Sequence, residues 1–415
     1  MTNKNNSSKI ISPMISRLQD EIKVNKKEAV SKFWKKIEEI GSPIFEDIEG
    51  DNKYNLITFV FREDEEVDNI VCHIFLYLQN MFVTEDIKEC LLERIKDTNV
   101  YFKSYKLLKG IRASYNFSKN NPLEPKNPTE NLFKYADSII PDPFNSKKYL
   151  FKMNGISFPL NEIESPEAPP QPWYGIRVNI DHGKVEEFTS HSEVLKNDRQ
   201  ILVYTPPNYS KNHIPYHFLL LFDGIMFEEI AKVSSTLDNL IADDKIPPVV
   251  AIMVENFLST NFALRSSELA PNPKFVEYII KELLPWVRQN FNVTTNPSQS
   301  VIAGASGGGV MSTFIAFKHP EIFGNVISMS GSYWKEGEEF AHQFAQSERL
   351  PLKFYLDVGV LEETSPSGIF ISNRHLRTVL QEKGYPVYYT EFLGGHDFIC
   401  FRGSIADGLI YLIGK

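Results

Sequence analysis

A serine among small residues is the strongest chemical signal in this chain. Residues 300–320 read SVIAGASGGGVMSTFIAFKHP, with an apolar run before the glycines and an amphipathic segment after them. The part from Gly304 to Gly308 fits the pattern G-x-S-x-G, in which a serine lies on a sharp turn between a strand and a helix. A phosphate-binding loop needs a lysine after its last glycine or the spacing G-x-G-x-x-G, and neither is present. The stretch therefore predicts Ser306 as a nucleophile, with a flexible turn as the remaining alternative.

A nucleophilic serine needs a base and an acid, and in this type of site the chain order is serine, acid, histidine. Four histidines follow Ser306, and His396 alone directly follows the last expected strand, where it would lie above the carboxyl edge of a sheet. We therefore expect His396 to be the base. The stretch from Leu356 to Glu363 offers three candidate acids, Asp357, Glu362 and Glu363. Glu362 is preferred because its loop can turn back toward His396, and Asp357, which lies within a strand, is the alternative.

Negative charge on the reacting carbonyl oxygen needs preorganised N–H donors. The residue after the nucleophile, Gly307, is expected to supply one backbone N–H. The second is expected from Gly224 or Ile225, in the turn after the early apolar strand 218–222. The alternative for Gly224 and Ile225 is a tight turn without a catalytic part.

These residues need a sheet to position them, and the second half of the chain has the pattern of one. From residue 216 onward, apolar runs alternate with helical segments such as 274–291 and 374–383. The runs are 217–222, 248–254, 301–303, 325–330, 352–358 and 387–392. Such alternation is typical of a parallel sheet with helices on both faces, as in an α/β-hydrolase catalytic domain. A β-hairpin centred on residues 181–183 is expected ahead of these apolar runs in the chain.

The first half of the chain has a different pattern. Apolar residues recur at helical spacing over 13–40. Short β-branched and aromatic runs follow at 54–62, 69–76, 100–105 and 111–117, which indicate an antiparallel β-sandwich. A proline-rich connection covers 121–168. The expected domains are an N-terminal extension, partly disordered, at 1–30, a sandwich at 31–150, and the α/β domain with its linker at 151–415.

Composition narrows the classes of partner and location. Lys and Arg total 44 against 53 Asp and Glu, a net charge of −9, so nucleic acid is not an expected partner. Three scattered cysteines predict neither a disulfide framework nor a zinc site. We see neither a signal-peptide core nor an apolar run long enough to cross a membrane, so we expect a cytoplasmic protein without membrane contacts. Nothing in the sequence specifies an oligomeric state.

Several motifs resemble those of the enterochelin esterase family of ferric-siderophore hydrolases. They are Phe222-Asp223-Gly224, Arg265-Ser266-Ser267-Glu268-Leu269, Lys281-Glu282-Leu283-Leu284-Pro285, Gly304-Ala305-Ser306-Gly307-Gly308, Ser330-Gly331-Ser332-Tyr333-Trp334 and the run from Gly394 to Gly403. The segment from Asp142 to Asn145 and the prolines up to Trp173 are similar to that family's linker. The resemblance covers nearly the whole chain except its N-terminal extension. One departure is Phe401, which stands where a tryptophan is usual.

The resemblance implies an immunoglobulin-like sandwich ahead of the catalytic domain. It also implies cytoplasmic hydrolysis of the ester bonds in a cyclic tri-ester catecholate siderophore, a trilactone of serine or threonine, usually in its iron-loaded form. A ferric tris-catecholate is anionic and aromatic, so Arg265, Arg402 and Trp334 are expected to bind it. A structural ion pair is the alternative for either arginine, with Glu268 as the partner of Arg265. Iron is part of the substrate, and neither a cofactor nor a protein metal site is expected.

Two other functions compete with this one. A feruloyl or acetyl esterase acting on plant polysaccharide would be exported, which disagrees with the expected lack of a signal peptide and the few cysteines. A catalytically inert, glycan-binding module has no evident need for Ser306, Glu362 and His396 together.

Overall fold

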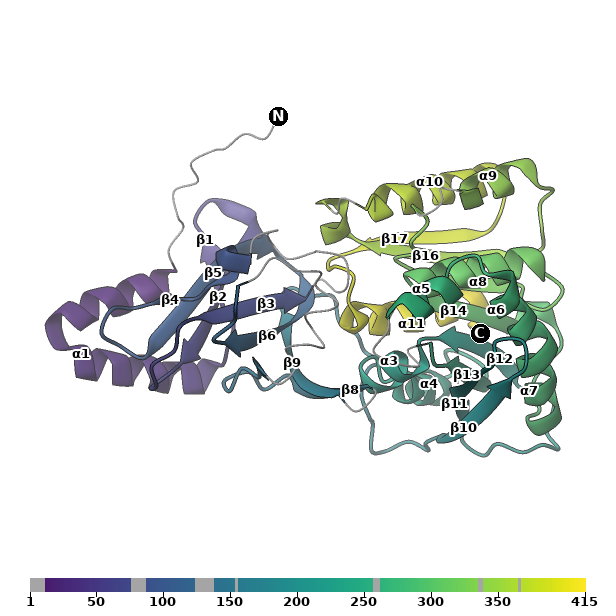
Figure 1. Ribbon diagram of the computed structural model, residues 1–415, viewed down its shortest axis with the longest axis horizontal. Helices are drawn as coiled ribbons and strands as arrows, with labels where there is room; N and C mark the ends of the chain where they lie inside the picture. Colours follow the sequence, from purple (N-terminus) through teal and green to yellow (C-terminus); the bar gives the residue numbers. More distant parts are fainter. Residues whose placement is uncertain are drawn as a thin grey trace. The chain divides into compact units, whose positions relative to one another are not determined.

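The chain folds into two compact units (Figure 1). The first consists of Met1–Phe151 and Ile156–Pro169, and the second of Lys152–Gly155 and Pro170–Lys415. The computed structural model describes residues 12–75, 87–123, 138–153, 156–256, 262–334, 339–364 and 367–415. The first unit extends past the boundary expected at residue 150, because strand β9 (Ile156–Glu164) pairs with a strand of that unit. Of the expected N-terminal extension, residues 1–11 lie outside the described ranges.

Helix α1 (Pro13–Ile40) begins the described part of the first unit, as its periodicity predicts. The Ser12 side chain accepts a hydrogen bond from the Ile15 N–H at 3.2 Å, and a proline at the first helical position suits the backbone there. Helical geometry is interrupted at Asn25, where φ is −147°. The apolar face of the helix joins residues of the first sheet and its loops in one buried cluster. Its members are Ile15, Leu18, Ala29, Phe33, Trp34, Ile37, Ile44, Val60, Ile95, Val100 and Phe102.

Two antiparallel sheets complete this unit. One has the order β1 (Ile44–Ile48), β2 (Asp51–Arg62), β5 (Val100–Leu108) and β4 (Glu93–Arg94). The other has the order β3 (Ile70–Phe75), β6 (Arg112–Lys119), β9 and β8 (Lys148–Met153), with β7 (Ile139–Ile140) also on β6. Rings of β2 and β6 meet between the sheets: the Phe59 and Tyr115 centroids are 4.8 Å apart, and those of Phe61 and Phe117 are 5.1 Å apart. The sheets therefore pack face to face as a sandwich.

The second unit is built on an eight-stranded mixed sheet with the order β10-β11-β13-β12-β14-β15-β16-β17. Six strands are parallel: β12 (His217–Phe222), β13 (Val249–Val254), β14 (Ser300–Ala305), β15 (Asn325–Met329), β16 (Lys353–Gly359) and β17 (Val387–Phe392). Strands β10 (Lys184–Ser192) and β11 (Asn197–Thr205) form an antiparallel hairpin at one edge. The predicted parallel sheet is thus confirmed for the strands that lead to the site.

The position expected for the hairpin is wrong. Its turn covers residues 193–196 rather than 181–183, and Lys196 has a φ of +55°. The Asp181-His182-Gly183 sequence looks like a turn because Asp and Gly favour one, whereas the real turn uses a lysine in the left-handed region, which sequence patterns do not favour.

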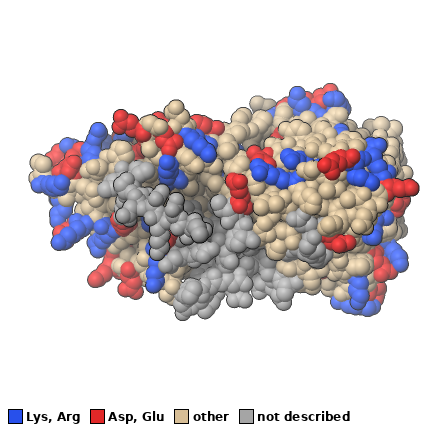
Figure 2. All heavy atoms as spheres, turned by 90° about the horizontal axis from the view of Figure 1, so that it is seen from above, with Lys and Arg blue, Asp and Glu red and all other residues tan. Residues whose placement is uncertain are grey.

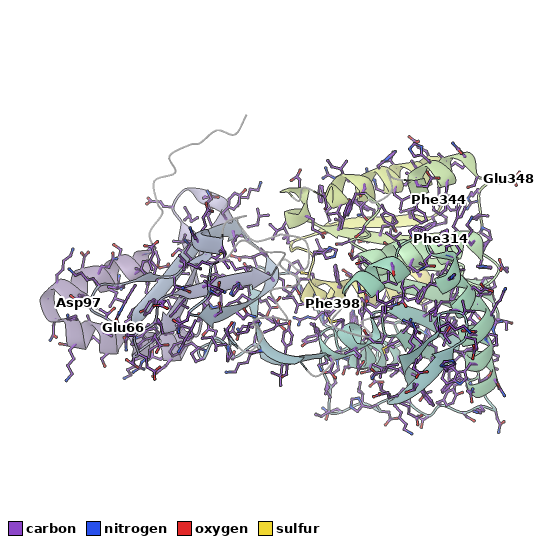
Figure 3. The ribbon with its side chains drawn as sticks, in the orientation of Figure 1. Glu66, Asp97, Phe314, Phe344, Glu348 and Phe398 are labelled. Atoms are coloured by element: carbon purple, nitrogen blue, oxygen red, sulfur yellow. The ribbon has the colours of Figure 1, made fainter. Side chains whose placement is uncertain are left out.

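Helices cover both faces of the sheet (Figure 1). On one face, α11 (Phe398–Ile413) lies beside α3 (Gly224–Glu229) and α4 (Val233–Ala242). On the other, one apolar cluster joins the sheet to α6 (Pro273–Tyr278), α7 (Leu284–Asn290), α8 (Gly307–Lys318), α9 (Glu339–Gln346) and α10 (Ile369–Glu382). Figure 3 labels two members of this cluster, Phe314 on α8 and Phe344 on α9, and it labels Phe398 at the start of α11. Both layers bury the sheet, and its packing holds the strand ends in place.

The described surface carries both signs of charge. In Figure 2, blue and red side chains are intermixed over the described atoms rather than gathered into one basic face. Among the described residues, no group of His, Cys, Asp and Glu could hold a metal ion. Within the same ranges, no helix has the length and apolar character needed to cross a bilayer.

Candidate active site

Ser306 lies at the tip of the turn between β14 and α8, with φ 58° and ψ −120°. Such a conformation is rare for a residue with a side chain, and it needs close packing around the turn to hold it. A Cβ on Gly304 would lie 2.5 Å from the carbonyl carbon of Gly308, and a Cβ on Gly309 would lie 2.4 Å from Ser328 Oγ. Strand and helix therefore meet only because these positions are glycine. The geometry of a nucleophile elbow results, with Ser306 9% exposed.

His396 and Glu362 are in direct contact at the carboxyl edge of the sheet. Glu362 lies in the 3-10 helix η6 (Val360–Thr364) directly after β16, and His396 lies in the loop after β17. The distance from Glu362 Oε2 to His396 Nδ1 is 2.8 Å, and both side chains are buried. Glu362 Oε1 accepts hydrogen bonds from Ser330 Oγ at 2.5 Å and from the Gly359 N–H at 2.9 Å. With Nδ1–H donated to the carboxylate, Nε2 is left as the acceptor that a general base requires.

Asp357, the alternative acid, lies inside β16 and is fully buried. In the described part of the chain, neither of its carboxyl oxygens meets normal hydrogen-bond geometry with a partner. Burial raises its pKa to about 8, although Ser404 lowers that pKa and the nearby charge of Glu362 raises it further. Of the candidate acids, it is Glu362 that the fold brings to His396.

The two turns expected to supply N–H donors lie together where the strand order reverses, because β12 is flanked by β13 on one side and β14 on the other. In open α/β sheets, ligands bind at the carboxyl ends of the strands at such a point. Gly224 and Gly307 are each the first residue of a helix, where a backbone N–H lacks an intrahelical acceptor. A Cβ on Gly308 would lie 3.4 Å from Phe222 Cβ, so the two turns are in close contact.

Ile225 is the part of the oxyanion prediction that needs correction. Its N–H donates to Glu255 Oε2 at 2.8 Å, so this donor is already used by a carboxylate. Gly224 has no room for a side chain, because a Cβ there would lie 2.8 Å from the carbonyl carbon of Met253. Of the two candidates in this turn, Gly224 therefore fits the donor role.

Arg265 forms an ion pair with Asp223, the residue that precedes Gly224. Its Nε and Nη2 donate to the two carboxylate oxygens of Asp223 at 2.7 and 2.5 Å, and both side chains are buried. Asp223 has a φ of +58°, and its N–H donates to Asn256 Oδ1 at 3.2 Å. The expected pairing of Arg265 with Glu268 is wrong, because Glu268 forms its ion pair with Arg199, with 2.6 Å between Glu268 Oε1 and Arg199 Nη2.

Arg402 and Trp334 lie on other elements of the second unit. Arg402, on α11, is buried, and its guanidinium carbon lies 3.7 Å from the centre of the Tyr174 ring. Its Nε donates to Gln171 Oε1 at 2.5 Å. Trp334 is half-buried at the end of the turn after β15, and residues 335–338 lie outside the described ranges. Arg265 and Arg402 are thus both held by protein groups of the second unit.

Sequence reasoning missed the roles of three residues that touch these groups. Ser332 Oγ lies 3.0 Å from Ser306 Oγ, and Ser330 contacts Glu362 as described above. Phe401 is buried and packs edge-on against the imidazole of His396, with centroids 5.5 Å apart. The Ser-Gly-Ser sequence after an apolar strand was a visible signal, but nothing in it says which side chains it meets.

Two family comparisons cover most of the chain. Residues 192–412 match the sequence model of a family described as "Putative esterase", and residues 56–174 match one described as "Enterochelin esterase, N-terminal". Among curated proteins, the iron(III) enterobactin esterase of Escherichia coli (strain K12) is 27% identical over 337 residues, covering 77% of this chain and 81% of the relative. That of Dickeya dadantii (strain 3937) is 23% identical over 417 residues, covering 92% of each chain.

Solved structures have the same fold. The crystal structure of the ferric enterobactin esterase from Salmonella typhimurium superimposes with a TM-score of 0.75 at 25% identity, covering 90% of this chain and 96% of the other. The esterase match spans the elbow, Glu362 and His396, so the elbow serine and the Glu362–His396 pair lie within one family domain.

Proposed function

Because this chain belongs to the enterochelin esterase family, we propose that it hydrolyses the ester bonds of a ferric tri-catecholate trilactone siderophore. The observation that carries the proposal is the match of an esterase domain and an enterochelin esterase N-terminal domain within one chain. The relatives that cover most of the chain are named iron(III) enterobactin esterases. The N-terminal match favours this function over a polysaccharide-directed feruloyl or acetyl esterase and over an inert glycan-binding module.

In the proposed mechanism, Ser306 Oγ attacks the lactone carbonyl carbon while His396 Nε2 takes the hydroxyl proton. The N–H groups of Gly307 and Gly224 hold the negative oxygen of the tetrahedral intermediate. His396 then gives its proton to the departing alkoxide, which leaves as the hydroxyl of the opened trilactone, and Ser306 keeps the acyl group. Water, deprotonated by His396, attacks this ester, and the released serine takes the proton back. Glu362 stabilises the imidazolium formed in both stages, which its contact with Nδ1 supports.

For substrate binding, we propose a direct contact for Trp334 and a cationic contribution from Arg402. Arg402 is held by Gln171 and stacked on Tyr174, so its charge has a fixed position for an anionic ligand. Arg265 forms an ion pair with Asp223, which supports a different role for Arg265: it fixes the turn that carries Gly224. Iron enters only within the substrate, and no cofactor takes part in these steps.

Two finer features belong to the same proposal. The sandwich of the first unit is proposed to be immunoglobulin-like, in keeping with its two packed antiparallel sheets and with the family match at residues 56–174. Iron release is proposed to occur in the cytoplasm, where a siderophore would be opened after import.

The test incubates the purified protein with serine-based and threonine-based tri-catecholate trilactones, each with and without iron, and follows the linear products by chromatography. We expect opening of at least one ferric trilactone, and loss of that activity in Ser306→Ala. Ser298→Ala, an exposed serine that precedes the same strand, is the matched control and should keep full activity. The proposal is wrong if no trilactone is opened, or if Ser306→Ala opens it as fast as the control does.

A further inference from the structure

Two serines in the turn after β15 contact different members of the site. Ser330 Oγ donates to Glu362 Oε1 at 2.5 Å. Ser332 Oγ lies 3.0 Å from Ser306 Oγ, and the Ser332 N–H donates to the Ser306 carbonyl at 3.1 Å. Both serines are buried. We infer that this turn, residues 330–332, positions the acid and the nucleophile together, an inference that rests on the proposed esterase mechanism.

Neighbouring elements hold the turn in place. Asn373 on α10 donates from Nδ2 to the Gly331 carbonyl at 2.7 Å. The Tyr333 hydroxyl donates to Ser328 Oγ at 2.7 Å and lies 2.6 Å from Thr313 Oγ1 on α8. A Cβ on Gly331 would lie 2.4 Å from the Tyr333 ring, so the turn has no room to shift toward it. The turn therefore has one well-defined position between β15, α8 and α10.

The backbone of the turn is strained at the residue that reaches the acid. Ser330 has a φ of +45°, and its N–H donates to the Asp357 carbonyl at 2.9 Å. A non-glycine residue in this region is unfavourable and persists only where its surroundings determine it. The strained backbone directs the Ser330 side chain toward Glu362, while Ser332, two residues on, faces the nucleophile.

The two contacts have different chemical consequences. The Ser330 hydroxyl neutralises part of the charge on Glu362 Oε1, which limits how tightly the carboxylate holds an imidazolium on His396. Without that hydroxyl, the acid–base pair of Glu362 and His396 is altered, and with it the dependence of the rate on pH. Ser332 restrains the Oγ position of Ser306, so its loss lowers the rate of attack equally at every pH. The pH–rate profile therefore separates the two roles from each other and from a loss of packing.

The experiment compares Ser330→Gly and Ser332→Ala with wild type. Glycine is chosen at position 330 because it removes the hydroxyl and relaxes the positive φ. Ser330→Ala is the second variant for that site. Ser372→Ala is the matched control, since Ser372 is a buried serine of α10 whose hydroxyl donates only to the Ile369 carbonyl among the contacts described for it. Turnover of p-nitrophenyl acetate and of a ferric trilactone is measured from pH 5 to 9, together with the rate at which a fluorophosphonate labels Ser306.

We expect kcat to fall about tenfold in all three serine variants, with KM nearly unchanged, because each loses one hydrogen bond to a reacting or charged group. The acid limb of the pH profile of kcat/KM should move in the Ser330 variants alone. Labelling should slow about tenfold in Ser332→Ala. The inference is overturned if kcat of a variant at either serine stays within twofold of the kcat of Ser372→Ala. It is also overturned if the acid limb of kcat/KM moves equally in all variants or in none.

The same experiment distinguishes this inference from the siderophore proposal. If wild type cleaves p-nitrophenyl acetate but opens no trilactone, the siderophore function fails, and the roles of the two serines are still decided by the simple ester and by labelling. If wild type opens the trilactone and the variants match the control, the inference fails alone. If wild type neither cleaves an ester nor labels at Ser306, both are overturned.

Discussion

Asp357 gives the folded protein a stability that depends on pH in a specific way. Its carboxyl is fully buried, has no hydrogen-bond partner of normal geometry in the described part of the chain, and has a pKa raised from 3.8 to about 8 by desolvation. The folded state therefore keeps this proton at a pH at which the unfolded chain has already released it. A raised pKa of a carboxyl in the folded state means that stability falls as the pH rises from 3.8 toward 8.

The size of the effect follows from the two pKa values. Across most of that range, the unfolded chain has lost one proton that the folded chain retains, so the free energy of unfolding falls by about 1.4 kcal/mol per pH unit. Between pH 5 and pH 7 the loss from Asp357 alone is about 3 kcal/mol. In Asp357→Asn this dependence disappears, because an amide of nearly the same shape has no proton to lose.

The assay is urea unfolding followed by circular dichroism at pH 5, 6, 7 and 8. Relative to wild type, Asp357→Asn should gain about 3 kcal/mol of stability between pH 5 and 7. Asp181→Asn, at an exposed position of the same unit, is the matched control and should follow wild type at every pH. If the difference in stability between Asp357→Asn and wild type does not change with pH, Asp357 is not a buried protonated acid, and the reasoning is refuted.

Three further changes test the site. Glu362→Gln should lower kcat about a thousandfold, because it removes the carboxylate that stabilises the imidazolium. A kcat within tenfold of the wild-type value would exclude Glu362 as the acid. Gly304→Ala should destabilise the protein by about 3 kcal/mol, because the new Cβ would lie 2.5 Å from the carbonyl carbon of Gly308. Thermal unfolding measures this, and an unchanged Tm would contradict the tight elbow. Arg265→Leu leaves Asp223 buried without its cation and should lower the free energy of unfolding in urea by about 3–5 kcal/mol. Normal stability with only a raised KM for the ferric trilactone would instead assign Arg265 to substrate binding.

The sequence predicts those parts of the molecule whose signals are local. Buried parallel strands need continuous apolar runs, so β12 to β17 are visible as such runs in the sequence. The elbow is visible because the strained Ser306 requires small neighbours within the same short stretch. Chain order and position relative to the strand ends then indicate His396 and restrict the acid to three residues.

What sequence reasoning leaves open depends on contacts between distant segments. The choice of Glu362 over Asp357 follows from the path of η6 relative to the loop that carries His396, which no local pattern specifies. The use of the Ile225 N–H by Glu255 and the pairing of Arg265 with Asp223 join residues far apart in the chain. The domain boundary was expected too early for the same reason, because β9 joins the first unit through pairing with β6 rather than through its own composition.

Buried charge is concentrated around the turn that holds Gly224. Arg265 pairs with Asp223 there, Arg199 pairs with Glu268, and Asn256 joins the two pairs by contacting Glu268 and the Asp223 N–H. Buried ion pairs contribute little net stability compared with apolar residues of the same volume, so stability alone does not account for two of them in one place. Asp223 has a left-handed backbone, which is unfavourable for a non-glycine residue unless its surroundings fix it. A bidentate guanidinium on its carboxylate supplies that restraint and thereby holds the turn that carries the Gly224 N–H, the donor proposed for the negative oxygen.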